Sequence, residues 1–325
     1  MRIAPILAVV GLAGFAVVPV DAKDRPDPSV VARHVDELLV TEYGSGIWKP
    51  PADDAIYLRR VFLDVIGQPP VPEDVLAYLA QSDSRKKEEI VDQLLDDPAF
   101  GLNWARYWRD VILLRRSEPR AVFAAPSVES FLSEAFNEGR SWASITRAFI
   151  TAKGDIRENG ATALIMAQGG RPEGSVSEIS RIFCGIQIQC AQCHDHPTDQ
   201  WKREQFHQLA AFFPRVAVRP TRDGEKRSFL VTVTDFEFRR RRRPNNNNRF
   251  RGTLEHRMPD LDKPTAPGEV MQPVFFATGK KLETGATDAE RRESLARWLT
   301  SSDNPWFAKA YVNRMWAELI GHGFY

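Results

Sequence analysis

The sequence predicts a mainly helical fold: a multi-helix globular domain, a small β-hairpin region and a C-terminal helical segment. Apolar residues recur at three- and four-residue intervals along most of the chain, which is the spacing of one helix face. A single later stretch, S-F-L-V-T-V-T-D-F-E-F, instead alternates and is rich in Val, Thr and Phe, as strands are. Eight tryptophans and nineteen phenylalanines indicate large aromatic cores.

The expected helices follow one another with few interruptions. Ser29 can cap the first helix, Pro72 suits the first position of another, and Gly321 suits the end of the last. Between Gly154 and Gly174 we expect a loop. The apolar stripes that mark the helices are, in chain order, 31–39, 58–65, 90–95, 104–112, 131–136, 145–149, 179–186, 206–213, 295–299 and 307–319.

Composition divides the chain into four parts. Residues 1–22 are a predicted signal peptide, and residues 23–215 form the expected helical domain that contains the cysteines. Residues 216–285 form a connector rich in strand and loop, and residues 286–325 begin a second helical domain. Within the connector, residues 239–251 are an Arg- and Asn-rich segment of low complexity, for which we expect a solvated insertion.

The first residues predict export. Arg2 precedes an apolar run, and Val20 and Ala22 stand at the −3 and −1 positions of a small-residue cleavage site, as in secretory signal peptides. The run is short for a bilayer span, and an uncleaved membrane anchor is the alternative. We therefore expect a periplasmic or secreted protein with no transmembrane segment after cleavage.

The charge of the whole chain points to no particular polymer. The chain has 44 basic and 43 acidic residues, so its composition predicts no specific nucleic-acid partner. The basic insertion leaves contact with an anionic polymer or with lipid headgroups open as an alternative to a solvated loop. Three cysteines are too few for a disulfide framework in a protein of this size.

Residues 190–196 read C-A-Q-C-H-D-H and carry the strongest chemical signal. We expect them to close a helix that runs from Ser177 to Gln189. The spacing Cys190-x-x-Cys193-His194 is that of covalent haem c attachment. The two thiols would bind the two vinyl groups of the porphyrin, and His194 would ligate the iron from the proximal side.

The other side of a haem iron normally takes a distal ligand, often Met or His. The sequence offers five candidates and does not choose among them: His196, His207, Met166, Met258 and Met271. Of the two histidines, His207, on the following helix, is better placed than His196, which is only two residues from His194. A single helical histidine is, however, more often a structural hydrogen-bonding group.

Two alternatives to haem remain open. Cys184, Cys190 and Cys193 could form a structural zinc site with one of His194, His196 or His207, although Cys184 lies among apolar residues where a cysteine is usually just buried. Cys190 and Cys193 could also form a redox or structural disulfide in an oxidising compartment. No G-x-S-x-G element or P-loop accompanies them, and we identify no catalytic constellation.

Several long segments resemble a known family. They are V-F-L-D-V-I-G-Q-P-P-V-P-E-D-V, L-L-D-D-P-A-F-G-L-N-W-A-R-Y-W-R-D, I-Q-C-A-Q-C-H-D-H-P-T-D-Q-W and, near the end, S-S-D-N-P-W-F-A-K-A-Y-V-N-R-M-W-A-E-L-I-G-H-G-F. The chain is similar to secreted planctomycete proteins with paired domains of unknown function fifteen forty-nine and fifteen fifty-three. The resemblance implies that the second domain is cut short here.

The C-x-x-C-H-x-H-P motif of the family matches Cys190, Cys193, His194, His196 and Pro197, and the resemblance implies haem c or another metal there. Planctomycete cytochrome c domains often accompany this family. Cys184 departs from the family pattern as we know it, which weakens the zinc alternative. We therefore expect an exported haem-binding or metal-binding protein that passes electrons to a partner redox domain or cytochrome. The alternative is a non-redox envelope or polymer-binding protein in which the motif is a zinc site or a disulfide.

Overall fold

The structure is a computed structural model that describes residues 27–47, 50–114, 118–223, 226–235 and 255–324. These residues are mainly α-helical, which confirms the predicted fold class. The predicted signal peptide and the insertion 239–251 lie outside the described residues. The chain divides into two compact units, Met1–Asp53 and Asp54–Tyr325, which are described separately. No helix in the described ranges is long and apolar enough to span a membrane.

The first unit holds helix α1 (Pro28–Tyr43) and a short 3₁₀ turn (Ser45–Ile47). The helix begins two residues earlier than the sequence indicated. The carboxylate of Asp27, rather than the side chain of Ser29, accepts the hydrogen bond of the N-cap, from the Ser29 amide at 2.8 Å. Pro28 follows the cap, where a missing N–H costs nothing because this amide has no partner inside a helix.

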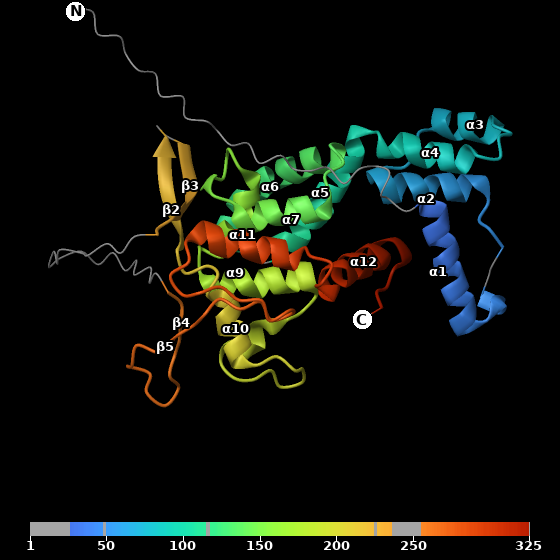
Figure 1. Ribbon diagram of the computed structural model, residues 1–325. Coiled ribbons are helices and arrows are strands. Elements are labelled where there is room, and N and C mark those ends of the chain that lie inside the picture. The colour runs from blue at the N-terminus through green and yellow to red at the C-terminus, as the bar shows by residue number, and fades with distance from the viewer. Residues whose placement is uncertain (1–26, 48–49, 115–117, 224–225, 236–254, 325) are drawn as a thin grey trace, which may run out of the picture. The chain divides into compact units, whose positions relative to one another are not determined.

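The second unit contains the remaining helices (Figure 1). They are α2 (Asp54–Ile66), α3 (Pro72–Ala80), α4 (Lys86–Leu95), α5 (Pro98–Ile112), α6 (Pro119–Asn137), α7 (Trp142–Thr151), α8 (Ala163–Ala167), α9 (Pro172–Ile179), α10 (Arg203–Ala210), α11 (Asp288–Leu299) and α12 (Pro305–Ile320). A 3₁₀ turn (Gly160–Thr162) precedes α8, so part of the predicted loop between Gly154 and Gly174 is helical.

Helix α5 illustrates how the sequence sets these elements. Asp97 caps it through the Ala99 amide, and Pro98 occupies its first position. Residues four apart then lie on one face, and that face buries Trp104, Trp108 and Ile112 against α6. The resulting core continues through α6–α11, whereas α2–α4 contribute a separate small cluster around Leu58, Phe62, Tyr78 and Leu94.

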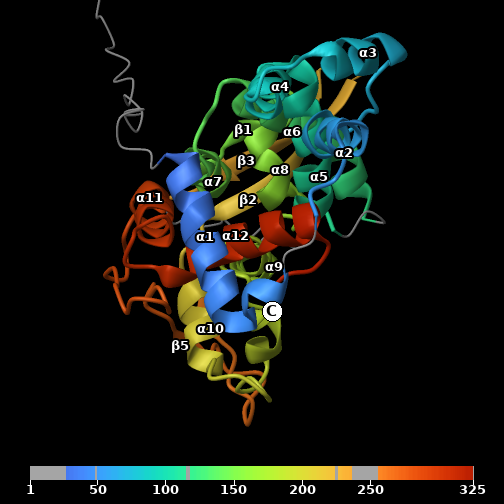
Figure 2. The same cartoon turned by 90° about the vertical axis from the view of Figure 1, so that its right-hand side faces the viewer.

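Three short antiparallel strands are the main β element (Figure 2). β1 (Gly154–Asp155), β3 (Lys226–Val233) and β2 (Val216–Asp223) are arranged in the order β1-β3-β2, with Val216 opposite Val233. Strand β3 falls in the stretch that the sequence predicted. Strand β2 contains Pro220 and lies at the edge of the sheet, where a residue without an N–H is tolerated. A second pair, β4 (Arg257–Met258) and β5 (Glu269–Val270), follows.

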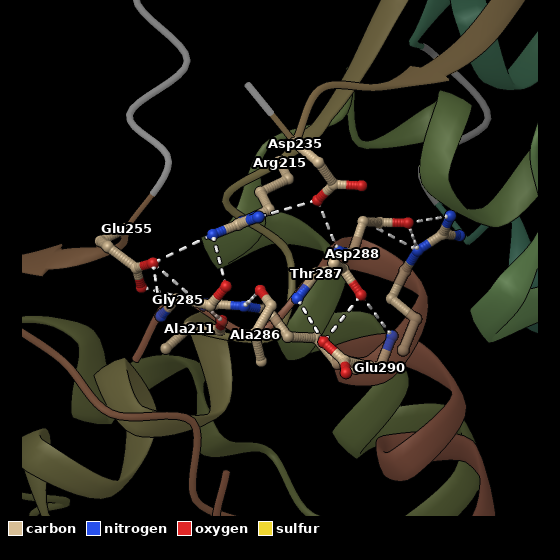
Figure 3. Close-up of polar contacts among 11 residues, drawn as sticks. Ala211, Arg215, Asp235, Glu255, Gly285, Ala286, Thr287, Asp288 and Glu290 are labelled. Carbon is tan, nitrogen blue, oxygen red and sulfur yellow. Dashed lines mark hydrogen bonds and ion pairs between the residues drawn. The ribbon is translucent and has the colours of Figure 1, made fainter. Parts of the chain in front are cut away.

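An ionic network fixes the start of α11 (Figure 3). Arg215 pairs with Asp235 at 2.8 Å and with Glu255 at 3.2 Å, so one guanidinium joins the residues on both sides of segment 236–254. The fully buried Arg291 donates to both oxygens of Glu255 and to the carbonyl of Ala211, just after α10.

The next residue of α11 reaches another helix. Arg292 pairs with Asp288 at 2.6 Å and donates to the carbonyls of Ile150 and Ala152 at the end of α7, beside which α11 lies in Figure 1. Positive charge is favourable at a helix C-terminus because the last carbonyls carry partial negative charge. Leu295 and Leu299 also share the main core, so packing joins segments that the sequence divided between two predicted domains.

Candidate functional site

The cysteine motif lies on a short turn between α9 and α10, and not at the end of a long helix as expected. After α9 the backbone widens to a π-helical segment (Ser180–Cys184) and ends at Gly185. Gly185 has φ +70°, a left-handed conformation that glycine adopts without the steric cost of a Cβ. A separate 3₁₀ turn (Ile188–Gln192) then carries the first cysteine.

This turn separates the cysteines of the motif from the core. In a 3₁₀ helix, residues three apart lie one above the other. Ile188 and Ala191, which are three residues apart in the turn, are therefore both buried, whereas Cys190 and Cys193, the residue that follows the turn, are both exposed free thiols. Two free thiols thus face solvent within four residues of the chain, as the attachment of one ligand at two points would require.

His194 follows directly and is exposed. Its Nδ1 lies 2.7 Å from the carbonyl oxygen of Asp195. Because a carbonyl only accepts hydrogen bonds, Nδ1 is the protonated nitrogen, and in the neutral ring Nε2 keeps its lone pair. A hydrogen bond at one ring nitrogen is the usual way in which a protein orients the other nitrogen toward a metal.

The loop after His194 is well organised. The Asp195 carboxylate accepts from the Arg203 amide and from Lys202 Nζ, each at 3.0 Å, and these bonds, that of the amide first, lower the pKa of Asp195. The His196 amide donates to the Trp201 carbonyl at 2.8 Å and closes the loop. Hydrogen bonds therefore order the chain that directly follows His194.

The structure places His207, the predicted distal ligand, in the interior of the protein. It is buried in α10, at 2 % exposure, and both ring nitrogens are engaged. Nε2 lies 3.0 Å from the carbonyl oxygen of Gln192, and Nδ1 lies 2.9 Å from Nε2 of His256. In these described contacts neither ring nitrogen has a free lone pair for an iron or zinc ion.

His256, which the sequence did not single out, completes this buried pair. Its ring stacks on that of His207 at 5.2 Å between centroids, and its Nδ1 lies 3.9 Å from Oε1 of Glu173 in α9. Burial lowers the pKa of both histidines to about 4, and for His207 the neighbouring His256 adds to this effect. Both rings are therefore neutral near pH 7. No spacing rule connects two histidines 49 residues apart.

Cys184 is separate from the exposed pair. It is 1 % exposed in the main core, and burial raises the pKa of its thiol to about 12, against a smaller opposing effect of a hydrogen bond with Asn304. A thiol in such surroundings is chemically inert. Among the residues that the structure describes, no three His, Cys, Asp or Glu side chains are grouped so as to hold a metal ion. The predicted zinc site with Cys184 is therefore not assembled in this conformation.

The fold and the site define a class: a mainly helical protein that carries an exposed Cys-x-x-Cys-His turn between two helices. Comparison with protein families narrows this class. The model described as "Protein of unknown function (DUF1549)" matches residues 34–218, and that described as "Protein of unknown function (DUF1553)" matches residues 291–325. The chain belongs to the DUF1549 family, which confirms the predicted paired-domain resemblance. No curated protein and no solved structure gave a match.

Proposed function

We propose that the protein binds haem c covalently through Cys190 and Cys193, with His194 as proximal ligand, and that it transfers electrons at the cell envelope. The observation that carries this proposal is that two exposed, free thiols three residues apart are followed directly by an imidazole with one nitrogen held by a hydrogen bond. Bound haem would supply one-electron redox chemistry, which none of the twenty side chains provides stably by itself.

The residues around the motif fit such a group. The two thiols would form thioether bonds on one edge of the ring without any rearrangement of the core, because both already face solvent. The Asp195 carbonyl would hold the Nδ1 proton of His194, and thereby keep Nε2 as the ligating nitrogen. An attachment site on the surface leaves the edge of the ring accessible to a redox partner. The predicted export agrees with this proposal, because haem c is attached to cysteine thiols outside the cytoplasm.

The proposal is tested by expressing the full chain, with its leader, in a bacterial host that carries a cytochrome c maturation system. We expect haem that stays with the protein after denaturation and a mass increase of one haem. Cys190→Ser and Cys193→Ser should each abolish double attachment. Cys184→Ala is the matched control, because its thiol is buried, and it should leave attachment intact.

The same experiment decides between haem and the alternatives. Folded, colourless protein that contains one equivalent of zinc would replace the haem proposal with a structural metal site. Folded, colourless protein with an oxidised Cys190–Cys193 pair would replace it with a disulfide. Either result would remove the basis for electron transfer and favour a non-redox envelope protein.

A further inference from the structure

A line of hydrogen-bonding groups connects the thiol-bearing turn to the interior. Gln192, which stands immediately before Cys193, presents its carbonyl to His207 in α10. His207 in turn contacts His256, which immediately precedes β4, and His256 faces Glu173 in α9. Four separate segments thus meet behind the exposed cysteines.

The chemistry of these groups fixes the direction of each hydrogen bond. The Gln192 carbonyl can only accept, so Nε2 of His207 carries the proton. In the neutral ring Nδ1 of His207 is then an acceptor, and Nε2 of His256 must be the donor. The Nδ1 of His256 is left as a lone pair beside the Glu173 carboxylate, at 3.9 Å, too far for a hydrogen bond. Every proton in the line therefore points toward the turn.

The surroundings keep the line in this state. His207 is 2 % exposed and His256 is 5 % exposed, so water does not compete for their nitrogens. The charged groups near the pair are Glu173 from α9 and Arg203 from α10, and Arg203 also donates to the carbonyl of Pro259, just after β4. These contacts hold the segment of His256 against α10.

We infer that His207 and His256 are positioning residues that hold the Cys190–Cys193 turn in the conformation in which both thiols face solvent. The ring nitrogens of a buried histidine pair could find hydrogen-bond partners at many places in a core. Here Nε2–H of His207 donates to the carbonyl of Gln192, which lies between the two cysteines in the sequence. In the described contacts the short 3₁₀ turn has no backbone donor of its own for this carbonyl at its end, so the histidine supplies the hydrogen bond. The benefit to haem attachment rests on the proposed function, whereas the ordering of the turn does not.

The test compares variants that remove the donor with variants that keep it. His207→Leu and His256→Leu abolish the line, whereas His207→Gln and His256→Gln retain an N–H donor and an acceptor at similar reach. Phe206→Leu, on the same helix and fully buried, is a control for general loss of stability. Hydrogen exchange of peptides that cover residues 186–196 measures local opening in the haem-free chain, and haem per protein is measured after expression with the maturation system.

The Leu variants should raise exchange in residues 186–196 by roughly fivefold or more, as expected when a buried carbonyl loses its donor. They should also lower haem per protein, and the Gln variants should restore both quantities. Unchanged exchange in the Leu variants, or an equal local rise in Phe206→Leu, would overturn the inference. Wild-type chain that takes up no haem but shows the expected exchange pattern would instead overturn the proposed function and leave the positioning role intact.

Discussion

Replacement of Arg291 by Met is the sharpest test of how α11 is held. Arg291 is fully buried and donates to both Glu255 oxygens, at 2.8 and 2.7 Å, and to the carbonyls of Ala211 and Ala286. Removal of one partner of a buried ion pair costs about 3–5 kcal/mol, because the other charge stays buried without compensation. Here Glu255 keeps Arg215 at 3.2 Å and the amide of Gly285 at 3.0 Å, and its side chain is 22 % exposed. We therefore expect a loss near the lower end, about 3 kcal/mol.

The assay is urea unfolding at equilibrium, followed by circular dichroism. Arg297→Met is the matched control, because Arg297 lies exposed on the same helix with one hydrogen bond to Ser294, and its replacement should change the free energy of unfolding by less than about 0.5 kcal/mol. The double variant Arg291→Met, Glu255→Met should lose less than the sum of the single variants, because it leaves no unpaired carboxylate. A loss in Arg291→Met no larger than that of Arg297→Met would refute the reasoning.

Three further predictions concern the histidine pair and two local signals. Because the folded-state pKa values of His207 and His256 lie at about 4, below the ordinary value of 6.5, the unfolded chain binds more protons between these values. Stability should therefore be fully present above pH 6.5 and fall by several kcal/mol for the hydrogen-bonded pair as the pH drops to 4, and a His207→Gln, His256→Gln chain should lack this part of the slope in urea titrations. Gly185→Ala should destabilise the protein by about 1–2 kcal/mol because of its positive φ, as measured by thermal unfolding. Asp97→Ala should cost about 1 kcal/mol through loss of the α5 N-cap, and Asp97→Asn should recover most of it.

The sequence predicted elements whose signals are local. Pro98 after Asp97 starts α5, and the Trp104 and Trp108 stripe follows the helical period, so the helix and its buried face could be predicted together. Strand β2 was missed because it contains Pro220 and Arg219, and only its pairing with β3 makes it a strand. β2 therefore has no alternating apolar pattern of its own, although its partner β3 is the next element along the chain.

The candidate site divides along the same line. Cys190, Cys193 and His194 could be found because their chemistry depends on sequence spacing, which the 3₁₀ turn preserves. The partnership of His207 with His256 could not be found, because it is created when β4 packs against α10. Gly185 could have indicated that the helix ends before the motif, since glycine is the common residue at a left-handed helix end.

The three cysteines of the chain are separated by their surroundings into two kinds, and this separation is the strongest argument about function. Cys184 lies in the core as a small apolar residue whose thiol stays protonated. Cys190 and Cys193 contribute nothing to that core, yet a buried, polar line of histidines ends on the carbonyl between them. A fold that needed this turn only for connection could fill the same volume with apolar residues and avoid burying two imidazoles. The positioning role inferred above for His207 and His256 accounts for the polar groups that lie behind the exposed thiol pair.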